Sequence, residues 1–406
     1  MVSHYRNINN KAFKIILFIV ALFFVSACSK EILLNPEIER SVLIYFAGNN
    51  NLSSDLKGNI EALKRGFIPE NGNVLVYLDV PNANPKLFRL VMNRKTNVIE
   101  EEFIEQYAAD ERSTNPAVLT KLLNRMRELF PAKEYGLILS SHGCGWVPAA
   151  MFSSTFFKQR NAISPLEYAR IEDLPTTKAF SQYGSDPGME LDEIAAAVPY
   201  HLSFILFDAC FMGSVEVAYA LRHVTDYLIA SPAEILSTGF PYDKIIQPMF
   251  LHVPDLSAVC NAFYSFYNEL PNEYWRSATV GLYQTESLDE LANVVKSIFI
   301  AHRTTLNHFS PDKVQHYANA SIFYDLDNFL MQLATPSEYA LFKESLDKVV
   351  LHKQATSRFY SLVTSAAYIT VNYFGGISTY IPVSTQQALC VAYKETAWNR
   401  AVRLVE

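Results

Sequence analysis

The chain has little cysteine, little glycine and no cluster of basic residues among its 406 amino acids. Charged residues make up 18% and half of all residues are hydrophobic, which excludes extended disorder and predicts a sizeable core. The net charge of −7, without a basic patch, excludes nucleic acid as the expected partner. No internal repeat is evident. The composition therefore describes a globular chain with one large core, or a core and a second subdomain.

The five cysteines match neither a disulfide framework nor a zinc ligand set, because their spacings fit no such pattern. A chain of this length also needs no covalent staples. We therefore expect free thiols at the last four positions, with two of them, Cys260 and Cys390, as ordinary buried residues. No Asp-rich calcium loop of the helix–loop–helix type is present. We expect neither a metal nor a cofactor.

A long apolar run occurs near the N-terminus, over residues 15–25, and follows a basic start. It is short for a membrane span and is typical of a secretory signal. Its end, V-S-A-C, resembles a bacterial lipobox, which predicts a signal peptide over residues 1–27, acylation of Cys28 and a tether over residues 28–40. Ser29 after the cysteine favours the outer membrane or cell surface. An ordinary signal cleaved elsewhere, or a buried helix, is the alternative.

Two short apolar runs predict buried, parallel strands that end in reactive side chains. Residues 204–210 (F-I-L-F-D-A-C) end at Cys210, and residues 135–141 (Y-G-L-I-L-S-S) end just before His142. If these strands are neighbours, the thiol and the imidazole meet at one edge of the sheet, as nucleophilic acyl transfer requires. A helix over residues 211–221 would place the thiol near its donor end, where a thiolate is favoured.

Each of these residues also has an ordinary explanation. Most free cysteines are small buried apolar residues, and many histidines are satisfied by the backbone. Cys144, beside His142, is expected to be only a neighbour, since it follows the other strand. Because both candidates end apolar strands and a glycine follows the histidine, the functional interpretation is favoured.

The rest of the chain predicts an α/β fold in two parts. Strands alternate with helices over residues 41–247, which is typical of a mostly parallel sheet covered on both faces. Residues 248–406 are mainly helical, with edge strands expected at 278–283 and 377–382. The irregular stretch over residues 146–188 is long for a loop within a compact domain, and such loops are usually functional or mobile.

The sequences S-H-G and D-A-C, each after an apolar strand, resemble the clostripain family of cysteine peptidases, relatives of the caspases, gingipains and legumain. The histidine precedes the cysteine by 210 − 142 = 68 positions, and this order suits that family and not papain-like enzymes. Residues 189–195 and 228–242 also look like family segments, so the resemblance covers roughly residues 41–242. It implies a caspase-like α/β/α sandwich with a mostly parallel central sheet, plus a mainly helical C-terminal subdomain.

The resemblance implies hydrolysis of peptide bonds through an acyl-enzyme. Cys210 would be the nucleophile and His142 the general acid and base. The backbone N–H groups of Gly143 and Cys210 would form the oxyanion hole, and glycine would let the substrate carbonyl approach the backbone. No third catalytic residue is implied.

The resemblance also implies a preference for Arg or Lys at the cleaved position, read by acidic groups. Asp208 is the first candidate for the acid that binds the basic side chain; the alternative is a carboxylate that only hydrogen-bonds neighbouring backbone. Glu234 is the second candidate, and its alternative is a solvated surface group. The segment S-P-A-E-I-L departs from the acid-rich segment of better-known members, so a strict basic preference is not implied.

Family members are cut in the region after the histidine. The candidate sites there are Lys158, Arg160, Arg170 and Lys178, each of which is otherwise a solvated charge. Calcium dependence occurs in the family and stays open here.

Three functions fit the sequence. The first is a lipid-anchored cysteine endopeptidase acting on a peptide or protein substrate, and the second is a non-catalytic surface-binding lipoprotein on the same scaffold. The third is a transpeptidase or amidase that uses the same pair of residues. We expect a monomer, and the intact His142 and Cys210 favour the first function over the second.

Overall fold

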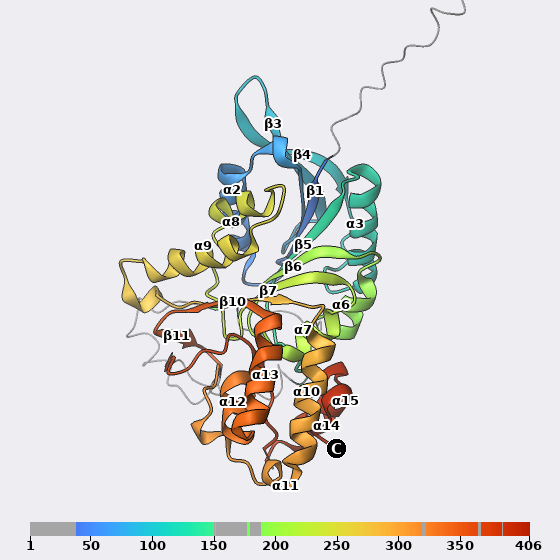
Figure 1. Ribbon diagram of the computed structural model, residues 1–406. Coiled ribbons are helices and arrows are strands. Elements are labelled where there is room, and N and C mark those ends of the chain that lie inside the picture. The colour runs from blue at the N-terminus through green and yellow to red at the C-terminus, as the bar shows by residue number, and fades with distance from the viewer. Residues whose placement is uncertain are drawn as a thin grey trace, which may run out of the picture. The chain divides into compact units, whose positions relative to one another are not determined.

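The central sheet is described by a computed structural model that covers residues 38–149, 151, 177–178, 188–318, 322–363, 367–383 and 385–406. Within these residues the sheet has nine strands in the order β10-β8-β7-β6-β5-β1-β2-β3-β4 (Figure 1). Their bounds are β1 (Arg40–Ala47), β2 (Asn73–Asp79), β3 (Lys86–Asn93), β4 (Val98–Gln106), β5 (Glu134–Ser140), β6 (Leu202–Asp208), β7 (Thr225–Ala230), β8 (Thr279–Gln284) and β10 (Val350–Ala355).

The middle of this sheet is parallel and its two margins are antiparallel. Strands β7, β6, β5, β1 and β2 run in one direction, while the β3–β4 hairpin and strands β8 and β10 add antiparallel pairs outside them. The residues of β1 and β6 are buried almost throughout, as the continuous apolar runs predict for strands covered on both faces. The predicted α/β class with a mostly parallel central sheet is confirmed.

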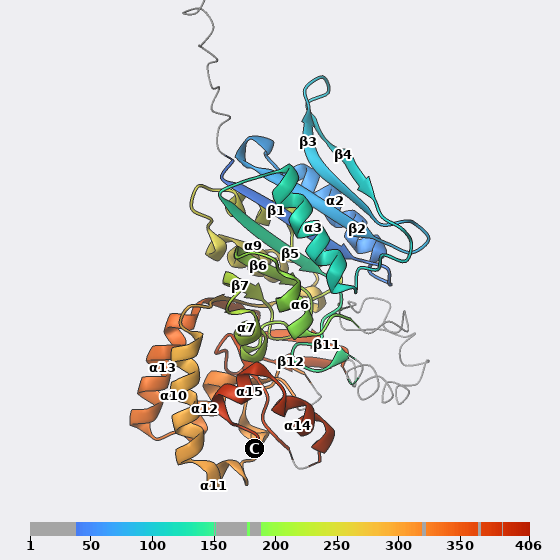
Figure 2. The same ribbon diagram turned by 90° about the vertical axis from the view of Figure 1, so that its right-hand side faces the viewer.

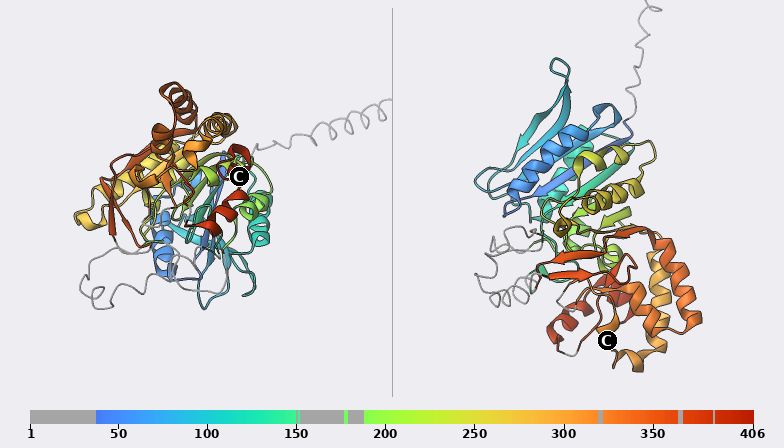
Figure 3. Two further views of the ribbon diagram at one scale, coloured as in Figure 1. Left: turned by 90° about the horizontal axis from the view of Figure 1, so that it is seen from below. Right: turned by 90° about the vertical axis from the view of Figure 1, so that its left-hand side faces the viewer.

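Helices cover both faces of the sheet. One face carries α2, α8 and α9, and the other carries α3, α6 and α7 (Figures 1 and 3). Helix α3 shows why such segments form: Asn115 caps it, Pro116 occupies its first turn, and five apolar residues form one buried stripe. The bounds are α2 (Ser53–Gly66), α3 (Pro116–Leu129), α6 (Leu191–Ala197), α7 (Val215–Leu221), α8 (Tyr242–Met249) and α9 (Leu256–Asn268).

The C-terminal part adds further helices at one end of the sheet (Figure 2). These are α10 (Leu288–Ala301), α11 (Arg303–Leu306), α12 (Leu326–Leu333), α13 (Pro336–Val349), α14 (Gln387–Lys394) and α15 (Ala397–Val402). Two small sheets accompany them, formed by β11 (Arg358–Ser361) with β12 (Ala367–Thr370) and by β9 (Tyr324–Asp325) with β13 (Ser378–Thr379).

The two parts of the chain share the central sheet, and residues 38–406 pack into one compact unit. The expectation that residues 278–283 form an edge strand is wrong, because β8 lies between β7 and β10. Residues 377–382 contribute β13 to a small separate sheet rather than an edge to the central one. The boundary after residue 247 stays a prediction and falls inside α8.

The predicted signal peptide and Cys28 lie outside the described residues, as does most of the stretch after residue 151. Among the residues that the structure describes, none of the helices combines the length and apolarity needed to cross a bilayer.

Candidate active site

The predicted pair of residues lies at one edge of the sheet because β5 and β6 are parallel neighbours. Ser140 pairs with Asp208 in the register of these strands, so His142 and Cys210 both lie two residues beyond the same pair. Gly143 packs directly against the cysteine: a Cβ at this position would lie 2.4 Å from the carbonyl oxygen and 3.0 Å from the nitrogen of Cys210. Glycine is therefore required here by the approach of the chain's own backbone.

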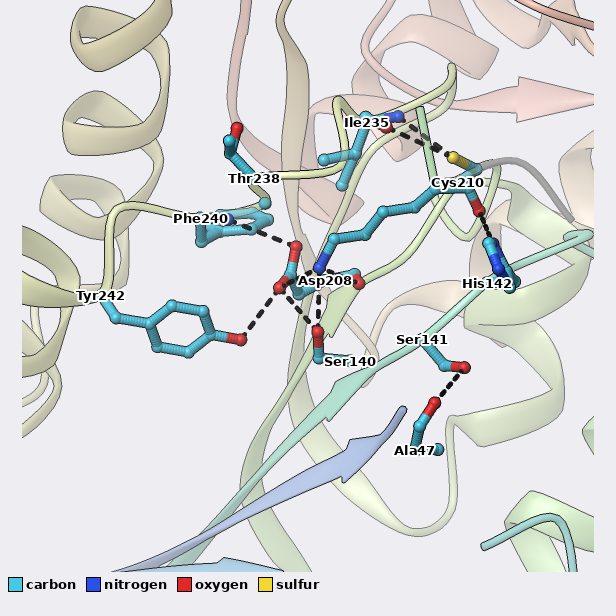
Figure 4. Close-up of polar contacts among 12 residues, drawn as sticks. Ala47, Ser140, Ser141, His142, Asp208, Cys210, Ile235, Thr238, Phe240 and Tyr242 are labelled. Carbon is cyan, nitrogen blue, oxygen red and sulfur yellow. Dashed lines mark hydrogen bonds and ion pairs between the residues drawn. The ribbon is translucent and has the colours of Figure 1, made fainter. Parts of the chain in front are cut away.

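Cys210 is completely buried, and its sulfur lies against the segment that follows β7. The Sγ atom is 3.2 Å from the nitrogen and 3.6 Å from the oxygen of Ile235 (Figure 4). Burial raises the pKa of the thiol well above its usual value, and the nearby Glu234 carboxylate raises it further.

The expectation that a helix favours the thiolate is therefore wrong for this state of the protein. Helix α7 begins at Val215, four residues later than predicted, and Ser214 caps it through a 3.3 Å bond from the Val217 N–H. Between the cysteine and this helix the chain turns at Phe211, whose φ of 63° lies in the left-handed region. Such strained backbone in a bulky residue is concentrated at functional sites.

His142 is held between two oxygen atoms. Its Nδ1 lies 2.8 Å from the carbonyl oxygen of Lys178, and its Nε2 lies 2.8 Å from Oδ1 of Asn51. Burial lowers the pKa of His142 to about 4, and the charge of Lys178 adds to this effect while the bond to its carbonyl opposes it. If the ring is neutral and its Nδ1–H donates to the Lys178 carbonyl, Nε2 accepts a hydrogen bond. The side-chain amide of Asn51 donates this bond when its nitrogen faces the ring.

Asn51 is a site residue that the sequence reasoning missed. It lies in the polar loop directly after β1, a strand that neighbours β5 in the sheet. The available signal was a polar residue beyond the carboxyl end of a central strand, the edge at which ligands bind in such sheets. A loop with three consecutive asparagines did not indicate which of them faces the histidine.

Asp208 lies at the floor of a closed pocket that is already filled. Its Oδ2 accepts from Ser140 Oγ at 2.8 Å and from the Tyr242 hydroxyl at 2.9 Å, and its Oδ1 accepts from the Phe240 N–H at 3.3 Å (Figure 4). The Lys178 ammonium completes the set at 2.5 Å from Oδ2, with both side chains 0% exposed. The predicted pocket carboxylate therefore binds a lysine of the same chain.

The backbone of Lys178 is also hydrogen-bonded to the segment after β7. The Lys178 N–H donates to the carbonyl of Ile235 at 2.8 Å, and Thr177 forms an antiparallel bridge with Leu236. Residues 177–178 thus add a short strand to residues 235–236, the mode in which an extended peptide binds to an exposed backbone edge. The Lys178 carbonyl then faces His142.

Glu234 is neither a solvated surface group nor a partner of Lys178. It is 1% exposed, and its carboxylate accepts from Thr177 Oγ1 at 2.6 Å. Ser361 Oγ donates at 2.6 Å, and the N–H groups of Leu362 and Val363 donate at 2.9 and 3.0 Å. Burial raises the pKa of Glu234, and these hydrogen bonds oppose the rise. The two predicted pocket acids therefore face two consecutive residues of the bound segment.

The remaining predicted residues contribute little or lie outside the described part. Cys144 is a free, half-buried thiol, and burial raises its pKa to about 12. Cys260 is buried as expected, whereas Cys390 is half-buried. Lys158, Arg160 and Arg170 are not among the described residues. Within the described residues no group of three or more potential side-chain ligands could hold a metal ion.

A cavity of about 850 Å³ opens on the β1 side of His142. Neither Asp208 nor the segment after β7 lines it, so it is distinct from the lysine pocket. Its polar lining comes from the loop after β1, from the chain before α3 and from the end of β5, and includes Asn49, Asn50, Asn51, Arg112, Ser113 and His142. His142 thus lines this cavity and also contacts Lys178.

The sequence pattern of the clostripain family matches residues 44–162 and 168–402 of this chain. Clostripain of Hathewaya histolytica is 26% identical over 239 residues, which cover 52% of this chain and 42% of clostripain. The match therefore spans less than half the length of that relative.

Two solved structures resemble the chain over nearly its whole length. An inactive zymogen C11 protease from Parabacteroides distasonis is 32% identical, with a TM-score of 0.77 over 90% of this chain and 98% of the other. A secreted C11 cysteine protease from Bacteroides thetaiotaomicron, in complex with an irreversible peptide inhibitor, is 25% identical, with a TM-score of 0.74 over the same shares.

Proposed function

The chain belongs to the clostripain family, and on that premise we propose that it is a cysteine endopeptidase that cleaves after Lys or Arg. Cys210 is the nucleophile and His142 the general acid and base. The observation that carries this proposal is Lys178, which places its ammonium on Asp208 and its carbonyl on His142 at the strand edge that also holds Cys210. No observation favours transpeptidation or amidase activity over hydrolysis.

In a substrate complex, the residue at the cleaved position takes the place of Lys178, and the reaction then proceeds in two stages. The Cys210 thiol gives its proton to His142, and the sulfur attacks the substrate carbonyl carbon. The N–H groups of Gly143 and Cys210 stabilise the oxyanion. His142 then protonates the leaving amine, which yields a thioester and a free amino terminus. Water attacks the thioester, returns a proton to the sulfur through His142, and releases the carboxylic acid.

The preference for a basic residue follows from charge and burial. Asp208 is buried, so a neutral side chain in the pocket would leave its carboxylate without a counter-charge, at a large cost. A second carboxylate, that of Asp55 in the first turn of α2, interacts electrostatically with the same ammonium. Burial raises the pKa of Asp55, and the charge of Lys178 opposes this rise. The pocket thus has an acidic floor and a further acid nearby. These features support Lys and Arg as the recognised residues.

The same geometry indicates how activity is controlled. While residues 177–178 occupy the site, a substrate cannot reach Cys210. We propose that cleavage after Lys178, at the bond to Ala179, releases the site. The resemblance to an inactive zymogen of this family supports this interpretation, and the cavity beside His142 supports an enzyme that accepts residues beyond the cleaved bond.

The test is a panel of fluorogenic peptides with Lys, Arg, Leu or Asp at the cleaved position, combined with mass spectrometry of the protein. We expect turnover of the Lys and Arg peptides at least 100-fold above the others, a cut after Lys178 in the wild type, and neither event in Cys210→Ala. Lys178→Arg serves as the matched control, since it keeps the basic residue and should still be cut.

Turnover that survives in Cys210→Ala would contradict the assignment of Cys210 as the nucleophile. Activity confined to Leu or Asp peptides would contradict the proposal that an acidic pocket selects Lys and Arg. An intact wild-type chain with full activity would remove maturation at Lys178 and leave the rest of the proposal standing.

We also propose that the protein is exported and anchored by lipid on Cys28 at the outer membrane or cell surface. The apolar run closed by V-S-A-C supports this proposal, as does a secreted relative with 25% identity. Labelled fatty acid should enter the wild type expressed in a bacterial host, and Cys28→Ser should carry none. Equal labelling of both proteins, or no label in the wild type, would contradict the anchor.

A further inference from the structure

We propose that Glu234 reads the residue before the cleaved one and selects a hydroxyl side chain, Thr or Ser, at that position. The inference rests on the proposed peptidase function and adds a second specificity site to it. Its basis is the bond between Thr177 and Glu234, which lies one residue before the lysine that fills the Asp208 pocket.

The geometry of this contact is that of a formed subsite. Thr177 is held in register by its bridge to Leu236, so the backbone, and not the hydroxyl, sets where its side chain points. The hydroxyl then donates to Oε2 of Glu234 at 2.6 Å, with both residues buried. The same segment, residues 234–236, thus contacts Cys210, the lysine N–H and the threonine side chain.

The carboxylate is fixed from its other side by a distant part of the chain. Ser361 Oγ, Leu362 N–H and Val363 N–H all donate to Oε1, and Leu362 N–H also lies 3.0 Å from Oε2. These donors hold the rotamer of Glu234 whether or not residue 177 is bound. Oε2 is then left aimed at the position of the incoming side chain, and among the described residues its one other hydrogen bond is the longer contact with the Leu362 N–H.

A buried carboxylate oxygen of this kind discriminates sharply. A hydroxyl donates to it, whereas Val, which has the shape of Thr, or Ala removes its water without replacing the hydrogen bond. An acidic side chain at the same position would meet a like charge. The expected order is therefore Thr and Ser first, Ala and Val far behind, and Asp and Glu last.

The test measures kcat/KM for tetrapeptide substrates that share Lys at the cleaved position and differ only in the preceding residue. For the matured wild type we expect Thr over Val, and Ser over Ala, by roughly 10- to 100-fold. In Glu234→Gln the Thr-to-Val ratio should fall severalfold below the ratio of the wild type, since a neutral amide forms a weaker bond than a carboxylate. The preference for Lys over Leu at the cleaved position should remain. Glu344→Gln, which removes an exposed carboxylate on α13, is the matched control and should keep the wild-type ratio.

Equal cleavage of the Thr and Val peptides would overturn the inference and leave the peptidase intact. A wild-type ratio that survives in Glu234→Gln would assign the selection to another residue. Failure to cleave any Lys or Arg peptide is a different result: it removes the proposed function, and the inference with it.

A second measurement does not depend on activity or on the folding of Glu234→Gln. In the uncut Cys210→Ala protein, Thr177→Val should lower the thermal midpoint, because it leaves Oε2 of Glu234 without its hydroxyl donor. Thr177→Ser should keep that midpoint within about a degree. Equal midpoints for the Val and Ser variants would show that the hydroxyl contributes nothing to binding of the segment, and would overturn the inference.

Discussion

At the scale of single residues, the candidate site is organised around the carboxylate of Asp208. Ser140, Phe240 and Tyr242 donate hydrogen bonds to it. The Lys178 ammonium is a further donor, and the absence of a side chain at Gly239 makes room for it. The pocket is thus shaped as much by a missing Cβ as by the acid.

Gly239 gives the sharpest test of this pocket. A Cβ there would lie 2.5 Å from both carboxylate oxygens of Asp208 and 2.7 Å from the Lys178 ammonium, and the φ of +70° disfavours any other residue. We expect Gly239→Ala to reduce kcat/KM for Lys and Arg peptides by at least 100-fold. The measurement is steady-state kinetics on the peptide panel, with circular dichroism to confirm the fold.

Gly58→Ala is the control for this substitution. Gly58 lies within α2, a Cβ added there would have no atom within 4 Å, and alanine is the better helix former. This variant should keep full activity and gain slightly in stability. Wild-type kinetics in Gly239→Ala would contradict the proposed pocket, because the lysine would then have to bind elsewhere.

At the scale of elements, the sequence predicted the two strands that end at the candidate catalytic residues. Apolar runs marked β5 and β6, and both end where the runs end, within two residues. The meeting of His142 and Cys210 at one edge followed from the parallel order, which the register of Ser140 with Asp208 confirms. Buried parallel strands have a strong signal because both of their faces are apolar.

Other elements had no such signal. Strand β10 reads V-L-H-K-Q-A and is half-exposed along its length, so neither an apolar run nor a clear alternation marks it. The pairing of Thr177 with Leu236 spans too few residues to show any period. Asp208 was predicted as a pocket acid, but its partner lies in an irregular stretch where four basic residues looked equivalent. Lys178 is the one of these four that the structure describes, and its bond to Asp208 could not be read from the sequence.

At the scale of the whole molecule, the C-terminal part holds the site in place. Strand β8 pairs with β7, and residues 361–363 hold Glu234. The buried Glu216 carboxylate of α7 accepts from Thr379, Tyr380 and Tyr393. Every one of these partners follows residue 247, although the predicted catalytic residues all precede it.

These contacts predict that the first part does not fold alone. A chain ending at Pro254 keeps α8 whole but exposes β7 as an open edge and leaves two buried carboxylates, Glu216 and Glu234, without donors from the second part. Each uncompensated carboxylate costs roughly 3 kcal/mol or more, against about 5–15 kcal/mol for the stability of a whole domain. We expect insoluble protein, or soluble protein without a near-ultraviolet circular dichroism signal and without activity.

The control separates the missing contacts from the mere break in the chain. Residues 251–253 are exposed, so a specific protease site inserted there allows the full-length protein to fold before it is cut. The cut protein should keep both fragments together and remain active, because the sheet and the carboxylate contacts persist. A soluble, folded and active chain ending at Pro254 would instead mean that the first part is an independent catalytic domain, and that the shared sheet is dispensable for holding His142 and Cys210 at one edge.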